Sequence, residues 1–143
     1  MLLNQSINKE LTSFLIFHIN DRELCLDMND LVKIMDLPES SLKNNKDSVM
    51  EFGGLAFNIL NLSKIFKLKK NKINCNSKMI LLEVKERAIC FIADKIVEIL
   101  ASNDRASETR TFIKSTDPYL KGIMQYEGRD ILVPDFGKII IDY

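Results

Sequence analysis

The stretch FHINDRELCLDMNDLVKIM, residues Phe17–Met35, recurs 65 positions later as LEVKERAICFIADKIVEIL, residues Leu82–Leu100. Cys25 falls on Cys90 in this alignment, and the apolar positions of the two copies coincide as well. Alternating apolar residues in both copies are typical of β-strands. This stretch therefore predicts that the chain contains one β-rich unit twice.

A second pair of blocks follows in the same order. Leu55–Phe66 lies over Arg129–Ile140 at an offset of 74. The larger offset means that the second copy carries nine extra residues, within Ala101–Pro118. Each unit would have about 60–70 residues, too few to bury much surface alone, so we expect the two to pack as one folding unit.

Turn residues divide each copy into short strands. Asn20-Asp21 and Lys85-Glu86 each separate two alternating apolar runs, and Gly53-Gly54 and Glu127-Gly128 each precede another. The segments after Asn61 and Asp135 begin with residues that cap helices. We expect strands at Ser13–Ile19, Arg22–Asp27, Leu55–Leu60, Lys78–Val84, Arg87–Ile92 and Arg129–Val133, short helices in Asn61–Leu68 and Asp135–Ile141, and strand or helical turn at Asn29–Met35 and Asp94–Leu100. Four or five short strands per copy predict a small barrel.

Composition indicates an ordinary globular protein. The 143 residues carry 20 Lys+Arg against 20 Asp+Glu, and 46% are hydrophobic. The sequence has no apolar run long enough to span a bilayer and does not begin with a secretion signal, so we expect a cytoplasmic protein with no membrane insertion.

Residues typical of catalysis or metal binding are sparse. His18 is the only histidine, and Cys25, Cys75 and Cys90 form no CxxC pair. No phosphate-binding or nucleophile motif is present. The sequence therefore predicts no enzyme activity, no metal and no cofactor, with Cys25 and Cys90 buried and Cys75 exposed.

One cationic run, Lys64–Lys72, leaves an alternative open. A small β-barrel could use these lysines for phosphates and Phe66 for base stacking. The chain has no net positive charge, and we expect a solvated linker between the two units and no nucleic-acid partner. A second polar stretch, Asn103–Thr116, is expected to be a mobile connection.

The blocks FLIFHIND, LVKIM, LAFNILNL, AICFIADKIVEIL and YLKGIMQYEGRDILVPDFGKII occur in an order that resembles the CheW-like domain of bacterial chemotaxis coupling proteins. The resemblance covers about 12–141, with approximate subdomains 12–70 and 77–141. It implies an all-β fold of two intertwined five-stranded SH3-like barrels with short helices. It also implies a non-catalytic adaptor that couples the regulatory domain of a CheA-type histidine kinase to the cytoplasmic tips of chemoreceptors.

The resemblance also suggests where partners bind. A receptor tip would lie in a groove between the barrels. A kinase would pair barrel against barrel, either around Gly53–Phe57 or at the end of the second barrel. The candidates are Leu31, Val32, Ile34 and Ile96 for the groove, and Gly53, Gly54, Leu55 and Phe57 for the kinase. Strand alternation would place Leu31 on one face of the strand and Val32 and Ile34 on the other.

The chain departs from the family at the middle strand. An Arg-Gly pair usually opens that strand, and here Gly53-Gly54 takes its place. This departure keeps open a diverged CheW-like scaffold that serves a kinase pathway other than chemotaxis.

Overall fold

The computed structural model describes residues 13–37, 49–101 and 110–143, and this part of the chain is mainly β. In these ranges a 3-10 turn, η1, and a short α-helix, α3, connect strands, and a second short α-helix, α5, follows the last strand. The elements in chain order are β1 (Ser13–Ile19), β2 (Arg22–Asp27), η1 (Met28–Asp30), β3 (Leu31–Asp36), β4 (Val49–Phe52), β5 (Leu55–Ile59), α3 (Leu62–Ile65), β6 (Lys78–Val84), β7 (Arg87–Ala93), β8 (Lys95–Ala101), β9 (Arg110–Lys114), β10 (Leu120–Tyr126), β11 (Arg129–Pro134) and α5 (Phe136–Asp142).

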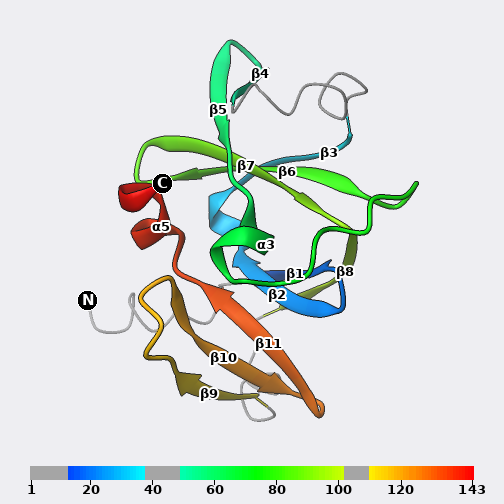
Figure 1. The fold of residues 1–143 in the computed structure, drawn as a ribbon, viewed down its shortest axis with the longest axis vertical. Helices are drawn as coiled ribbons and strands as arrows, with labels where there is room; N and C mark the ends of the chain where they lie inside the picture. The colour runs from blue at the N-terminus through cyan, green and yellow to red at the C-terminus, as the bar shows by residue number, and fades with distance from the viewer. Residues whose placement is uncertain (1–12, 38–48, 102–109) are drawn as a thin grey trace.

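The strands form two sheets that exchange their first hairpins (Figure 1). One sheet has the order β8-β1-β2-β11-β10-β9, and the other has the order β3-β6-β7-β5-β4. The β1–β2 hairpin therefore sits among strands of the second copy, and the β6–β7 hairpin sits among strands of the first. This exchange confirms the expected all-β fold of two intertwined units.

The internal repeat relates the two sheets strand by strand. Replacing β3, β6, β7, β5 and β4 by their repeat partners β8, β1, β2, β11 and β10 converts one order into the other. The registers agree too, because Asn58 lies beside Ile89 in one parallel pair, as Leu132 lies beside Leu24 in the other. Strand β9 has no counterpart among the described residues, and it lies within Ala101–Pro118, the region that contains the nine extra residues of the second copy.

Local sequence explains the turns and the helix starts. Gly53 and Gly54 have φ values of 59° and 80°, the left-handed geometry of a two-residue hairpin turn that glycine adopts without strain. Asn61 and Asp135 cap the two helices, each accepting a hydrogen bond at 3.1 Å from a backbone N–H three residues later. The helical turns expected after Asn61 and Asp135 are confirmed.

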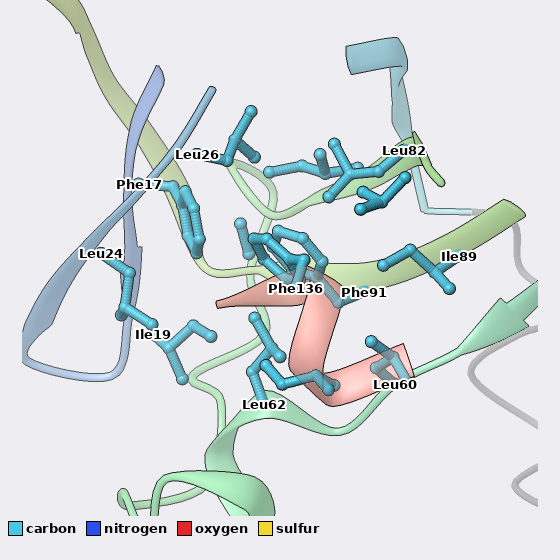
Figure 2. Packing of buried hydrophobic residues seen from close by; sticks show 14 of the residues in the cluster. Phe17, Ile19, Leu24, Leu26, Leu60, Leu62, Leu82, Ile89, Phe91 and Phe136 are labelled. Atoms are coloured by element: carbon cyan, nitrogen blue, oxygen red, sulfur yellow. The ribbon is translucent and has the colours of Figure 1, made fainter. Parts of the chain in front are cut away.

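The largest hydrophobic cluster lies between the sheets and draws on both of them (Figure 2). Phe91 stands at its centre, with ring centroids 5.0 Å from Phe17 and 5.8 Å from Phe136. Leu15, Phe17 and Ile19 share one face of β1 and all enter this cluster, as the alternation of the sequence predicts. Because both units contribute to one core, neither keeps that core without the other.

Each sheet also curls around a smaller cluster of its own. Ile16 and Cys25 pack with Ile131 inside the six-stranded sheet. Leu81, Cys90 and Phe57, their repeat partners, pack inside the five-stranded sheet. Burial on both faces of β1, β2, β6 and β7 explains why these strands are nearly continuous apolar runs.

A buried carboxylate ties the linker between the units to the sheets. Asp94 is 4% exposed and follows β7. It accepts hydrogen bonds from the backbone N–H of Asn20 at 2.5 Å, from Asn71 Nδ2 at 2.7 Å and from the backbone N–H of Lys72 at 2.9 Å. Its repeat counterpart, Asn29, is exposed.

Two expectations need correction or completion. The polar stretch Asn103–Thr116 was expected to be a connection, but Arg110–Lys114 within it forms β9 and pairs with β10. Residues 102–109 lie outside the described part. Polar edge strands have weak apolar alternation, which is why the sequence pattern did not reveal β9.

The sequence left Asn29–Met35 and Asp94–Leu100 open between strand and helical turn. Asn29–Met35 contains the end of η1 followed by β3, and Asp94–Leu100 contains β8.

Candidate docking surfaces

The segments expected to line a groove are edge strands of the two sheets. Among the described residues β3 pairs only with β6, and β8 pairs only with β1. Leu31 and Ile34 on β3 and Ile96 on β8 are half-buried and pack against the shared core. Val32, in contrast, is 43% exposed. Of the four candidates, Val32 therefore offers the most apolar surface to solvent.

A change of register explains this distribution along β3. The pairing with β6 shifts between Leu31 and Lys33, which is the signature of a β-bulge. The bulge breaks the strict alternation, so Leu31 and Ile34 face the same core cluster. The expectation that alternation would separate Leu31 from Ile34 was wrong for this reason.

The second candidate surface is the β4–β5 hairpin, which projects from the rest of the molecule (Figure 1). Gly53 and Gly54 form its exposed turn, and Leu55 next to them is 52% exposed. Phe57 is only 1% exposed and belongs to the inner cluster of the five-stranded sheet. Phe57 therefore anchors the hairpin, and the exposed apolar group at its tip is Leu55.

Sequence reasoning missed other exposed apolar side chains. Ile99 on β8 is 60% exposed, and Phe112 and Ile113 on β9 are also exposed. Ile99 precedes the buried Leu100, so alternation along β8 was a usable signal for it. The β9 residues gave no signal, because their strand was not expected.

The cationic linker is held against the protein. Lys67, Lys69, Lys70 and Lys72 are exposed, but Asn71 and Lys72 are bound by Asp94. Phe66, the residue that would stack on a base, packs against the shared core. This arrangement gives the lysines a solvated position and leaves Phe66 facing the core.

A charged network crosses the six-stranded sheet at the turn between β10 and β11. Arg129 Nη2 lies 2.8 Å from Glu98 Oε1, and Arg129 Nη1 lies 3.5 Å from Glu23 Oε1. Glu23 Oε2 also lies 3.3 Å from His18 Nε2. The hydrogen bond to Glu98 raises the pKa of Arg129 above its ordinary value. The network joins β8, β1, β2 and β11, so it places the single histidine in a structural cluster of polar and charged side chains.

The buried cysteines are held as thiols. Burial raises the pKa of Cys25 and of Cys90 to about 12, from an ordinary value of 9.0. A thiol with such a pKa stays protonated near neutral pH, and the thiolate is the nucleophile. Cys75 is exposed, as expected.

The residues that the structure describes contain neither a metal-binding cluster nor a membrane-spanning helix. No group of three or more His, Cys, Asp or Glu side chains is arranged to hold a metal ion in that part of the chain. None of the helices described is long and apolar enough to cross a bilayer.

The fold and its edges define a class of protein: two pseudo-symmetric curled sheets that exchange hairpins, with exposed apolar groups on edge strands. A model of the CheW-like domain matches residues 13–142, and the chain belongs to this family. No curated protein matches the sequence. The crystal structure of scaffolding protein TtCheW from Thermoanaerobacter tengcongensis matches with a TM-score of 0.67 and 14% identity, over 87% of this chain and 84% of that one. At this identity the structural match supports the fold alone.

Proposed function

We propose that this CheW-like scaffold is a non-catalytic adaptor that couples the regulatory domain of a CheA-type histidine kinase to the cytoplasmic tips of chemoreceptors. The proposal is carried by one observation: a CheW-like fold in which two separate surfaces, β3 and the β4–β5 tip, present exposed apolar side chains. Apolar groups ringed by polar residues are typical of docking sites. Two such surfaces on one domain suit a protein that bridges two partners.

In this proposal the receptor tip contacts Val32 beside Leu31 and Ile34 on β3, and Ile96 on β8, the edge strand of the other sheet. The kinase contacts Leu55 and the turn at Gly53 and Gly54, while Phe57 holds the hairpin in place. The adaptor changes kinase activity by holding the kinase in one geometry, and it contributes no chemistry of its own.

Paired substitutions separate the two surfaces. Val32→Asp should weaken binding of a receptor-tip fragment about tenfold or more, because a charge replaces a desolvated apolar contact, and it should leave kinase binding unchanged. Leu55→Asp should do the reverse. Both positions are exposed, so the free energy of unfolding should change by only about 0.5 kcal/mol. Isothermal titration calorimetry with each partner measures both affinities.

Ile141→Asp is the matched control, since Ile141 is exposed on α5, away from both surfaces. The absence of a kinase complex at about 50 µM protein would overturn the proposal. Leu31→Asp is a poorer test, because Leu31 packs against the shared core and its loss would also destabilise the fold.

A second candidate is a diverged scaffold that serves one kinase pathway outside chemotaxis. The observation that favours it is the uncharged hairpin tip, where Gly53 and Gly54 carry no side chain to form an ion pair. Kinase binding without any receptor binding would select this candidate.

A further inference from the structure

A cavity of about 450 Å³ opens beside the N-terminus of α5, between residues of both sheets. Its walls include the apolar side chains of Phe14, Leu26 and Phe136. Asp27 and Asp30 line it from the end of β2 and from η1. None of these residues belongs to the docking surfaces proposed above.

The internal repeat shows what occupies the equivalent place in the other unit. An offset of 65 relates the cavity residues Lys85 and Asp27 to Asn20 and Ile92. There, residues 70–72, which we call the strap, lie against the protein. Asn20 Nδ2 donates to the carbonyl of Lys70 at 2.7 Å, and Asn71 Nδ2 donates to the carbonyl of Ile92 at 3.0 Å.

The strap is also held by carboxylates. Asp94 accepts from Asn71 Nδ2 and from the backbone N–H of Lys72, and Lys72 Nζ lies 3.1 Å from Asp21 Oδ1. The strap therefore combines backbone and amide donors with a lysine ammonium. Lys85 and Lys121 line the cavity, but among the described residues no segment lies across it as the strap does, and the equivalent space is open.

The cavity offers acceptors for the same kind of ligand. Asn29 stands at the position of Asp94, but Asp27 and Asp30 flank it with carboxylates. Asp27 Oδ1 accepts from the backbone N–H of Asn29 at 2.9 Å. Among the described residues, no group donates a hydrogen bond to the half-buried carboxylate of Asp30. Burial, and then the nearby charge of Asp27, raise the pKa of Asp30 above its ordinary value although the charge of Lys121 lowers it, so a further cationic partner would be favourable there.

We propose that this cavity binds an extended, lysine-bearing segment of a partner polypeptide, in the way that the strap lies on Asp94. The segment's N–H groups donate to the carboxylates of Asp27 and Asp30. Its lysine ammonium sits near Asp30, and the aliphatic stem of that lysine packs on the apolar wall.

The probe is a blocked peptide that contains the strap and its flanking residues, KLKKNKIN (residues 67–74). It is titrated into the full-length protein. We expect saturable amide chemical-shift changes at Asp27, Asp30 and Lys85 by NMR. Asp27→Asn with Asp30→Asn should weaken binding about tenfold, since charge-assisted hydrogen bonds become neutral ones. Asparagine still caps η1, so the fold should persist. Asp30→Asn alone, which touches no cap, should show a smaller loss.

The matched control is Glu51→Gln, an exposed carboxylate on β4 that does not line the cavity, and it should bind the peptide as the parent does. Shift changes confined to Asn20 and Asp94 would mean that the peptide only displaces the strap, and would overturn the proposal. Equal binding of a peptide with glutamates for lysines, or no saturable binding at millimolar peptide, would overturn it too. Kinase and receptor affinities of the same variants, measured separately, report on the adaptor function alone.

Discussion

At the scale of the residue, Asp94 is the contact that the repeat would not have predicted. Its carboxylate holds the turn after β1 and the linker between the units, segments that lie far from it in the sequence. Because Asp94 is buried, its removal would leave the part-buried backbone N–H groups of Asn20 and Lys72 without their hydrogen-bond acceptor.

Asp94→Ala should therefore lower the free energy of unfolding by about 3 kcal/mol, the cost of leaving buried donors unpaired. Urea denaturation followed by circular dichroism measures this. Asn29→Ala, at the repeat-related and exposed position, should change it by less than about 0.5 kcal/mol. A similar small effect for both variants would show that Asp94 is not what holds the linker.

At the scale of the element, β9 marks the difference between the two units. It pairs with β10, whereas β4, the repeat counterpart of β10, ends its sheet in the described part of the chain. Because Gly122 on β10 has no side chain, β9 can approach β10 closely at this position. A Cβ built there would lie 2.5 Å from the ring of Phe112 and would collide with the carbonyl oxygen of Ile113.

Gly122→Ala should destabilise the protein by about 2 kcal/mol, because the β9 backbone has to move. The matched control is Gly137→Ala in α5, where a Cβ meets the flexible end of Lys85 at 3.1 Å and Asp135 Oδ1 at 3.4 Å, and where alanine favours a helix. That variant should be neutral or slightly stabilised. Thermal unfolding of both variants makes the comparison, and equal destabilisation would contradict the close approach.

At the scale of the whole molecule, the exchange of hairpins makes the two sequence halves interdependent. The β1–β2 hairpin completes a sheet made by the second half, and the β6–β7 hairpin completes a sheet made by the first. Each half alone would expose the apolar faces that now form the shared core. Folding should therefore be a single cooperative event.

Fragments 1–75 and 76–143 should each show no cooperative thermal transition when expressed alone, and mixing them should restore one. Near-ultraviolet circular dichroism and NMR dispersion measure the recovery of packed side chains. The intact chain provides the reference transition. A cooperative transition in either fragment by itself would show that a half can fold without the exchanged hairpin.

The sequence predicted most of the hairpins and missed what depends on long-range contacts. The ranges of β1, β2 and β6 agree with the strands expected from the apolar runs and the turn residues that bound them. The bulge in β3 and the half-burial of Leu31 did not follow from alternation, because the pairing with β6 determines them. Leu55 and Phe57 lie two positions apart on the same strand, and alternation gives them the same face. Only the packed structure shows that Phe57 is buried and that Leu55 is exposed at the tip of the hairpin.

The repeated unit, its turns and its helix caps can be predicted from the amino-acid sequence, because they depend on periodicity and on residues close together in the chain. The folded arrangement is needed to show which hairpin enters which sheet, where β9 joins, and that a cavity remains open beside α5 while the equivalent place in the other unit holds the strap. These features depend on contacts between segments that are distant in sequence. The two copies of the unit pack together through these contacts.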